Sequence, residues 1–565
     1  MTGFAQQIFL KEQNKEIDAF SFSLFQTLLK KGYFSYLEAE FAKQAQTPAE
    51  ANLLAFVLLA ARNGHLAVKI NADEIIPSPH DFTGFSTEVE VAEEETNALI
   101  ACLKVACSPH LHTLEDYVYI PRYYSYETQF LSLLKAILVD KVEVEIALEK
   151  VTYMLERQLK DKKLLPLQAR AIEQSLLNPL TILTGGPGTG KTYTASHLIH
   201  TLWEALSEDE KKYYEIVVCA PTGKATAHLH ASLAKLLSDD TLLSCLSSKT
   251  LHSLLGIKPS SSSLLDDELE SITADLIIVD ESSMIDASLM IKLLSARKKG
   301  SRIVLIGDKY QLPPVESGSF FADLCDMLPE YTVELIHCMR SELKSIINLS
   351  KAINEGDTKK VLSLFPALQP FDFKEDEIKQ MQEQIIHLML DHFPCTQEDE
   401  KEFSSFRVLS PIRKGFLGVD ELNRLCALKL QDRAKSLQKP FVAPIMLSAN
   451  DHVKRLYNGE VGLLFFREDM QIDYACFQEK RFLPRELPPY EYGYCLSVHK
   501  SQGSEFDHVL LTLPEGSEQF GKEALYTAVT RAKKSLKIVA SDKILANCVA
   551  RPSRRISSLC HRWTI

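Results

Sequence analysis

The chain has 565 residues, of which 45% are hydrophobic and 24% charged, and its formal net charge is −12 at pH 7. This length and composition predict about three or four soluble globular domains. The acidic balance argues against a protein that coats nucleic acid, although a local basic groove is compatible with it. No apolar run reaches the ~20 residues of a bilayer span and no secretory signal pattern opens the chain, so we expect a cytoplasmic protein without membrane contact.

The twelve cysteines are scattered, and none of them forms a C-x-x-C pair. This spacing indicates a reduced protein without a zinc or iron–sulfur site. His228 and His230 have no cysteine or carboxylate at metal-ligand spacing, so an incidental surface position is the favoured interpretation for that pair.

Residues 1–155 carry no catalytic signature and are expected to form a mainly helical domain. Apolar residues recur at helical spacing just after Phe22 and over 50–62, and a short strand is predicted at 66–70. The acidic stretch from Glu88 to Glu95 is interpreted as a solvated loop.

Residues 156–343 alternate short aliphatic runs with helical patterns. Continuous valine, isoleucine and leucine runs are typical of strands that are buried on both faces of a parallel α/β sheet. The predicted strands are 180–184, 216–220, 276–279 and 303–306. A serine-rich and acidic piece interrupts this pattern, and we expect an insertion at about 257–272 that projects from the domain.

A glycine-rich segment joins the first of these strands to the helix that follows it. Residues 185–192 read Gly-Gly-Pro-Gly-Thr-Gly-Lys-Thr and fit the pattern G-x-x-x-x-G-K-[ST] in the required strand–loop–helix context. Small residues let backbone N–H groups surround a phosphate, and the helix N-terminus adds partial positive charge. Lys191 is expected to neutralise the β- and γ-phosphates, and Thr192 to hold Mg²⁺. The predicted nucleotide-binding residues of this loop are Gly185, Gly186, Pro187, Gly188, Thr189, Gly190, Lys191 and Thr192.

Polar residues follow two more of the aliphatic runs. Asp280 is expected to bind the Mg²⁺ shell, and Glu281 to orient and deprotonate the attacking water. A core strand that simply ends in surface acids is the alternative interpretation. Gln311, in the Gly-Asp-Lys-Tyr-Gln segment after the next run, is expected to sense the γ-phosphate by hydrogen bonding.

Residues 344–565 repeat the α/β pattern less densely, apart from a different stretch at about 437–490. Asn458-Gly459 within that stretch is a strong turn signal. A small β-barrel inserted into a second α/β domain is the interpretation that fits. The strand candidates of this insert are 444–448, 461–466 and 473–477.

With these motifs in place, the chain resembles a superfamily 1 helicase. Gln168, in Leu-Pro-Leu-Gln-Ala-Arg ahead of the loop, resembles the adenine-reading glutamine of that superfamily. Arg340 resembles the arginine that reaches the γ-phosphate from the second lobe, and Arg531, in Tyr-Thr-Ala-Val-Thr-Arg-Ala, resembles the arginine finger. Glu505 belongs to the motif that joins DNA and nucleotide and is an implied nucleotide contact. The resemblance implies ATP and Mg²⁺ as cofactors, with hydrolysis that depends on lobe closure.

Other segments resemble the DNA-contacting motifs of the superfamily: Ala-Pro-Thr-Gly-Lys-Ala at 220–225, Lys-Thr-Leu-His from 249 and Ser-Val-His-Lys from 497. Hydroxyl, basic and backbone groups hold phosphates without reading sequence. The same residue types also serve in turns and helix caps, which is the alternative for each position. The implied DNA contacts are Pro221, Thr222, Lys224, Thr250, His252, Ser497, His499 and Lys500.

Within superfamily 1B the resemblance is to the RecD-like branch, over nearly the whole chain. It is carried by 307–315, by 498–506 and by Pro-x-Arg-Lys-Gly-x-x-Gly-Val at 411–419, with the insert where that branch has an SH3-like barrel. Residues 119–127 resemble the branch's Leu-x-Arg-x-Trp-x-x-Glu segment more weakly, with tyrosine in place of tryptophan. The short stretch after His252 predicts a reduced strand-separating pin.

The resemblance implies an α/β fold with two RecA-like parallel-sheet motor domains, a helical N-terminal domain and an SH3-like β-barrel insert. The implied boundaries are 1–155 for partner docking, 156–343 for the first motor domain and 344–565 for the second. The implied function is an ATP-dependent 5′–3′ DNA helicase, the alpha subunit of a RecBCD-type exodeoxyribonuclease V complex acting in double-strand break repair and homologous recombination. Single-stranded DNA, duplex ends, and RecB-like and RecC-like subunits are the implied partners, with the N-terminal domain docking on the gamma subunit.

Three alternatives remain open. A stand-alone RecD-like helicase usually has helix-hairpin-helix repeats in a longer N-terminal region, and 1–155 shows no such Gly-x-Gly pattern. The helicase domain of a conjugative relaxase needs a metal-binding histidine cluster near the start, whereas His65 and His80 stand apart. An inactive scaffold is disfavoured by the intact motor residues. No carboxylate and lysine cluster resembles a nuclease site, so the chain is not expected to be the nuclease itself.

Overall fold

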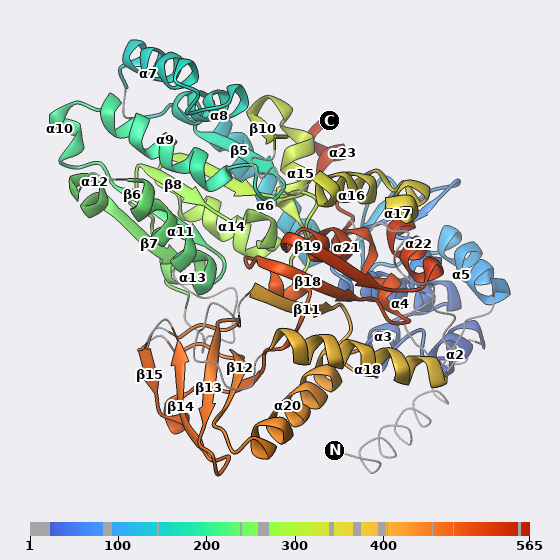
Figure 1. Cartoon of the computed structure of the whole chain (residues 1–565). Coiled ribbons are helices and arrows are strands. Elements are labelled where there is room, and N and C mark those ends of the chain that lie inside the picture. Colours follow the sequence, from blue (N-terminus) through green and yellow to red (C-terminus); the bar gives the residue numbers. More distant parts are fainter. Residues whose placement is uncertain are drawn as a thin grey trace.

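The computed structural model comprises an N-terminal unit and two α/β domains, the second of which carries an antiparallel insert (Figure 1). Arg340 and most of the insertion predicted at 257–272 lie outside the described residues. Within those residues, no helix combines the length and apolar character needed to cross a bilayer. The structure describes residues 23–82, 93–143, 146–237, 240–257, 270–337, 344–364, 375–393, 403, 405–451, 453–454, 456–477, 480–551 and 555–564.

The N-terminal unit packs helices against a small antiparallel sheet with the strand order β2-β1-β4-β3. The helices predicted after Phe22 and at 50–62 are confirmed as α2 and α4, and the strand predicted at 66–70 is shortened to β1. Residues 83–92 of the acidic region lie outside the described residues, but Glu93 begins α5, so its end is helical rather than a loop. The bounds are α2 Ser23–Lys30, α3 Tyr36–Ala42, α4 Pro48–Arg62, α5 Glu93–Val105, β1 Val68–Ile70, β2 Ile75–Ile76, β3 His112–Leu114 and β4 Tyr117–Tyr119.

The first α/β domain, named the first motor domain after the resemblance given above, is a six-stranded parallel sheet with the order β10-β5-β9-β8-β6-β7. The four predicted strands are confirmed as β5, β6, β8 and β9, because their aliphatic residues are buried by helices on both faces. The sheet strands are β5 Leu180–Gly185, β6 Ile216–Ala220, β7 Leu246–Thr250, β8 Leu276–Val279, β9 Arg302–Gly307 and β10 Thr332–Leu335. The helices are α7 Leu148–Lys160, α8 Pro166–Leu177, α9 Lys191–Ala205, α10 Glu208–Lys211, α11 Gly223–Leu236, α12 Asp240–Cys245, α13 Leu251–Leu254, α14 Ala287–Ala296 and α15 Phe320–Met327.

Helix α6 (Pro121–Leu138) comes from the stretch assigned to the N-terminal domain but packs in the first motor domain. Its Phe130 lies 4.2 Å from Phe320 of α15 between ring centroids, and Leu134 is fully buried in the same apolar cluster as Ile277. This packing groups α6 with the first parallel sheet, whereas the sequence predicts a domain boundary at 155, after this helix.

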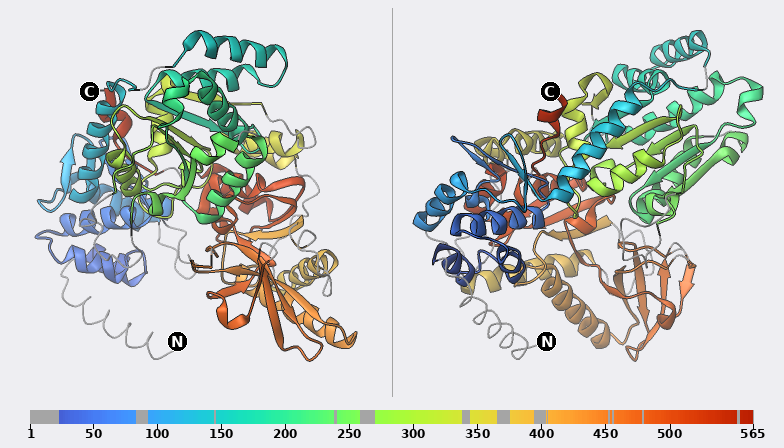
Figure 2. Two further views of the ribbon diagram at one scale, coloured as in Figure 1. Left: turned by 90° about the vertical axis from the view of Figure 1, so that its left-hand side faces the viewer. Right: turned by 180° about the vertical axis from the view of Figure 1, so that it is seen from behind.

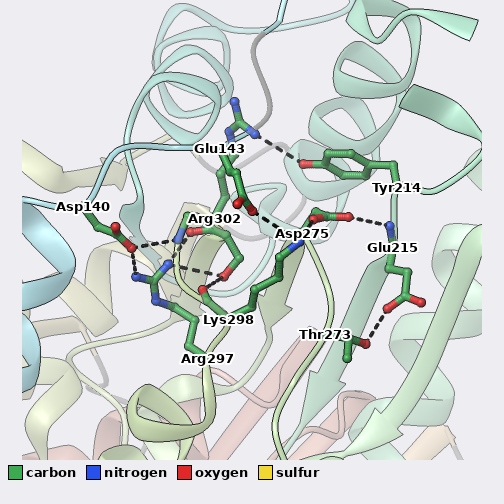
Figure 3. A network of polar contacts seen from close by, with 11 residues as sticks. Asp140, Glu143, Tyr214, Glu215, Thr273, Asp275, Arg297, Lys298 and Arg302 are labelled. Atoms are coloured by element: carbon green, nitrogen blue, oxygen red, sulfur yellow. Dashed lines mark hydrogen bonds and ion pairs between the residues drawn. The ribbon is translucent and has the colours of Figure 1, made fainter. Parts of the chain in front are cut away.

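A polar network braces the amino ends of β6, β8 and β9, at the end of the sheet opposite the glycine-rich segment 185–192 (Figure 3). Asp275 accepts a hydrogen bond from the Glu215 backbone N–H at 3.0 Å and pairs with Lys298 at 2.8 Å. Arg297 pairs with Asp140 at 2.6 Å, and both side chains are nearly inaccessible to solvent. The network therefore ties the end of α6 to the sheet.

The second motor domain has a four-stranded parallel sheet with the order β17-β11-β18-β19. Its strands are β11 Phe406–Ser410, β17 Cys495–Ser497, β18 Phe506–Thr512 and β19 Ala532–Val539. Its helices are α16 Lys344–Glu355, α17 Thr358–Leu364, α18 Glu375–His392, α20 Val419–Ser436, α21 Gly521–Val529 and α22 Asp542–Ala550.

The insert is a five-stranded antiparallel sheet with the order β15-β14-β13-β12-β16. All three strand candidates are confirmed, and Gly459 between β12 and β13 has the positive φ of 81° that its turn requires. Figures 1 and 2 show the insert and the N-terminal unit on opposite sides of the molecule. The likeness of the insert to an SH3 barrel stays a prediction. The strands are β12 Phe441–Leu447, β13 Val461–Phe466, β14 Ile472–Phe477, β15 Lys480–Phe482 and β16 Tyr490–Tyr492.

Residues 555–564, here called the C-terminal strap, leave the second motor domain and return to the first (Figures 1 and 2). The strap carries α23 (Leu559–Thr564), and Leu559 is fully buried in the apolar cluster of the first motor domain. The Ile556 N–H donates to His65 Nδ1 at 3.0 Å, and the Ser558 N–H donates to Glu127 at 3.0 Å. The strap thus joins the N-terminal unit, α6 and both motor domains.

Candidate nucleotide and nucleic-acid site

The phosphate loop is the turn between β5 and α9. Gly188 and Gly190 have φ angles of 72° and 86°, which glycine adopts without strain. A Cβ atom at Gly190 would lie 2.7 Å from Gln168 Nε2, so a larger residue there would also require the Gln168 side chain to shift. Helix α9 begins at Lys191 directly after this turn, and its first backbone N–H groups therefore point at the loop.

Lys191 is folded over the phosphate loop. Its Nζ donates to the Gly185 carbonyl at 2.7 Å and to the Gly186 carbonyl at 3.1 Å. The Thr189 hydroxyl donates to the Gly186 carbonyl at 2.8 Å, which holds the turn closed. Residues 187–192 all line one cavity of about 1150 Å³.

Gln168 lies behind the loop, with 1% of its surface exposed. Its Oε1 accepts from the Leu165 N–H at 2.9 Å, and its Nε2 donates to the Thr189 carbonyl at 3.5 Å. Gln168 is not among the residues that line the cavity. In this structure it supports the loop, and its adenine-reading role stays a prediction.

Acidic side chains gather where β8 and β9 end, beside the phosphate loop. Asp280 and Glu281 line the cavity, and the Glu281 N–H donates to Asp280 Oδ1 at 2.8 Å. Glu281 has a positive φ of 51°, an uncommon conformation for a residue other than glycine. Burial raises the pKa of both carboxyls, and Asp280 raises that of Glu281 further. Asp308 follows β9, and burial raises its pKa as well.

Gln311 reaches the same cavity from the loop after β9. Its Nε2 donates to Asp308 Oδ2 at 3.3 Å, while its buried Oε1 has no hydrogen-bond partner among the described residues. A buried polar atom without a partner is costly, so this position favours an incoming ligand or water.

The N–H groups of the glycine-rich loop, a lysine and buried carboxylates together form a site that fits magnesium and a nucleoside triphosphate.

The second motor domain completes the cavity with Arg531, two residues after α21 ends at Val529. Arg531 is 3% exposed; its Nε donates to the Thr527 carbonyl at 3.0 Å and its Nη1 to the Ser504 carbonyl at 3.2 Å. Glu505 also lines the cavity and lies 3.8 Å from Lys533. The structure therefore brings Lys191, Glu281 and Arg531 to one cavity from two domains.

Among the described residues, three hydrogen bonds join the motor domains at the loop after β9. The Tyr526 hydroxyl donates to Asp308 Oδ2 at 2.9 Å. The Leu312 N–H donates to Thr527 Oγ1 at 2.9 Å, and Gln502 Nε2 donates to the Leu312 carbonyl at 3.3 Å. Sequence reasoning missed Tyr526 and Asp308. The signal was their position inside the same motifs as Arg531 and Gln311.

The first-lobe DNA candidates follow the paired strands β6 and β7, in which Ala220 is the partner of Thr250. Pro221 lies between β6 and α11, and His252 is exposed on α13. Thr222 caps α11 and Thr250 caps α13, each accepting a backbone N–H at 3.2 Å. Lys224 differs from the other members of this set, because it lines the cavity.

The second-lobe DNA candidates follow β17. Ser497 Oγ accepts from the Lys500 N–H at 3.3 Å, and Lys500 Nζ pairs with Glu491 at 2.7 Å. His499 packs edge-to-face on Phe520, and burial lowers its pKa. The DNA roles of both sets stay predictions.

Two protein families match this chain: the AAA domain over residues 163–368 and the UvrD-like helicase C-terminal domain over 492–539. The RecBCD enzyme subunit RecD of Mycolicibacterium smegmatis is 33% identical over 412 residues, which cover 70% of this chain and 74% of that protein. The chain belongs to the RecD family. This RecD-family chain is a superfamily 1 helicase with two RecA-like motor domains, so the predicted family and α/β fold class are confirmed.

The RecD-family chain is also similar to the ATP-dependent RecD2 DNA helicase of Deinococcus radiodurans, at 31% identity over 65% of this chain and 47% of that protein. Among solved structures, the Pif1 helicase of Bacteroides bound to single-stranded DNA is similar, with 16% identity and a TM-score of 0.36. The match covers 67% of this chain and 93% of that one.

Proposed function

We propose that this RecD-family chain is an ATP-dependent translocase that moves 5′ to 3′ on single-stranded DNA, as the motor subunit of a RecBCD-type exodeoxyribonuclease V complex. The observation that carries the proposal is the shared cavity, which Lys191 lines from the first motor domain and Arg531 from the second. A site completed by two domains makes hydrolysis depend on their closure, so turnover can drive a cycle of closing and opening.

Each side chain of the cavity has a proposed task. Lys191 and the loop N–H groups bind the β- and γ-phosphates, and Arg531 neutralises the charge that develops during transfer. Glu281 accepts the proton of the attacking water, which Gln311 orients. Thr192 and Asp280 would hold Mg²⁺, which when bound neutralises phosphate charge. The remaining proposed nucleotide contacts are Gln168, Arg340 and Glu505.

The DNA candidates would hold the phosphate backbone of one strand. Thr222 and Thr250 stand at the carboxyl ends of neighbouring strands of the first sheet, and Ser497 at the end of a strand in the second. Hydroxyl and backbone groups bind phosphates without reading sequence. Two domains that grip alternately while they close and open convert each nucleotide cycle into a step.

For the complex, we propose that the N-terminal unit docks on a RecC-like gamma subunit, with a RecB-like subunit supplying the nuclease. Broad coverage of a RecD subunit supports this assignment. The alternative is a stand-alone RecD-like 5′–3′ helicase, favoured by the similarity to a RecD2 helicase. Affinity purification of the full chain from its native cell decides between them. Two large co-purifying subunits are expected, and a chain that purifies alone contradicts membership of the complex.

Two measurements on the purified chain test the motor. Lys191→Ala should abolish DNA-stimulated ATP hydrolysis, while Lys235→Ala, an exposed position on α11, should not change it. Normal hydrolysis by the Lys191 variant would refute the assigned site. Duplexes with a 5′ overhang should be unwound in preference to those with a 3′ overhang, and the opposite preference would refute the polarity.

A further inference from the structure

Lys224 lies where the two motor domains meet inside the nucleotide cavity. It is the second residue of α11 and lines the same cavity as Lys191 and Arg531. Its Nζ donates to Ser504 Oγ at 2.6 Å, across the boundary between the first and second motor domains. This placement differs from the DNA-facing position that the sequence motif suggested.

Ser504 connects Lys224 to the arginine of the second motor domain. Its hydroxyl accepts from Lys224 and its backbone carbonyl accepts from Arg531 Nη1 at 3.2 Å. Ser504 is 8% exposed; the bond from Arg531 is buried, and the bond from Lys224 is half-buried at the cavity wall. A hydrogen bond with a charged donor in such surroundings is stronger than a neutral one.

The residues around Lys224 come from several parts of the chain and line the same cavity. A Cβ atom at Gly223 would lie 2.3 Å from the Tyr457 ring, so glycine is needed for the loop of the insert to pack here. Burial and the charge of Arg407 lower the pKa of Lys224 to about 8, and Glu460 acts in the opposite direction. The ammonium is therefore charged at neutral pH, in a pocket formed by both motor domains and the insert.

We propose that Lys224 is a positioning residue of the ATPase site, which fixes Arg531 through Ser504 when the motor domains close, rather than a residue that grips DNA. The inference rests on the proposed function and deepens it. Lys224 acts on turnover without touching the reacting atoms, so its loss affects the rate of hydrolysis more than the binding of either ligand.

The test is steady-state ATP hydrolysis by the full chain with single-stranded DNA. Lys224→Ala should lower kcat at least tenfold, with less than a twofold change in the KM for ATP and in the DNA concentration that gives half-maximal stimulation. Lys224→Arg, which keeps a charged donor, should restore most of the rate. In the background of Arg531→Ala, the Lys224→Ala change should cause no further loss, because its effect passes through that arginine.

Ser504→Ala is the second variant, and it keeps the backbone carbonyl that accepts from Arg531 while removing the hydroxyl. It should reproduce the loss of kcat seen for Lys224→Ala, whereas Lys235→Ala on the same helix should match the wild type. If Lys224→Ala does not fold, Ser504→Ala still tests whether the hydrogen bond between these two residues supports turnover.

Two other outcomes overturn the inference separately. An unchanged kcat with a tenfold higher DNA requirement in Lys224→Ala would identify a DNA grip. Unequal effects of Lys224→Ala and Ser504→Ala, with the serine variant at the wild-type rate, would break the proposed connection. A wild-type chain without DNA-stimulated hydrolysis would refute the proposed function itself.

Discussion

Replacing Tyr526 by phenylalanine tests whether the motor domains communicate through the loop after β9. The Tyr526 hydroxyl on α21 donates to Asp308 Oδ2 at 2.9 Å, and the two residues are 3% and 1% exposed. Phenylalanine keeps the ring in the apolar cluster that also contains Leu312 and removes the hydroxyl alone. Among the described residues, Asp308 Oδ2 then keeps Gln311 Nε2 at 3.3 Å as its donor.

The size of the effect follows from the burial of this bond. A hydrogen bond to a charged group contributes about 1.5–3 kcal/mol. Because every 1.4 kcal/mol is a factor of ten, the ratio of closed to open molecules should fall by roughly 10- to 150-fold. Turnover requires the closed arrangement, so kcat/KM for ATP should fall by the same range.

The assay is DNA-stimulated ATP hydrolysis with kcat and KM determined separately. Tyr310→Phe is the matched control, since Tyr310 lies in the same loop but is 36% exposed, and its variant should stay within twofold of wild type. Asp308→Asn combined with Tyr526→Phe should lose less than the sum of the two single losses. Wild-type kcat/KM in Tyr526→Phe, or strictly additive losses in the double variant, would refute the reasoning.

Three further outcomes are expected. Arg531→Ala should keep nucleotide affinity within about threefold in a binding titration while turnover falls by about 10³ or more; an equal loss of affinity would indicate a structural role. Because burial lowers the pKa of His65 to about 3, the unfolded chain alone gains a proton below pH 6.5, and stability should drop by up to about 1.4 kcal/mol per pH unit as the pH falls. Urea midpoints at pH 7.5 and 5.5 should show a shallower drop for His65→Asn, and equal drops would contradict this assignment. Leu559→Ala should destabilise the first motor domain by about 2–5 kcal/mol in thermal unfolding, and an unchanged midpoint would mean that the strap is not part of that core.

The strands that the sequence predicted correctly are those whose side chains are buried on both faces of the sheet. The runs ending at Val279 and Ile306 are aliphatic throughout because helices cover both faces of the sheet. The edge strands were not predicted, because their residues are not uniformly aliphatic. Strand β7 reads Leu-Ser-Ser-Lys-Thr, and a strand with one paired edge tolerates polar residues.

The sequence predicted the residue types of the candidate site but not the direction in which each side chain points. A motif gives spacing along the chain, so Lys191, Asp280 and Arg531 could be assigned to one cavity in advance. Spacing does not say which way a side chain turns at a domain boundary. Gln168 turned behind the loop and Lys224 turned into the cavity, because partners from distant segments, Thr189 and Ser504, receive their hydrogen bonds.

The C-terminal strap has a consequence for how the protein is made. The first motor domain has all its strands once Leu335 is synthesised, but its apolar cluster is completed by Leu559. At about 5–20 residues per second, the ribosome needs roughly 10–45 seconds to cover that interval. During this time the apolar surface beneath α23 faces water on the nascent chain. That surface becomes buried only once Leu559 has been synthesised and α23 has packed on it.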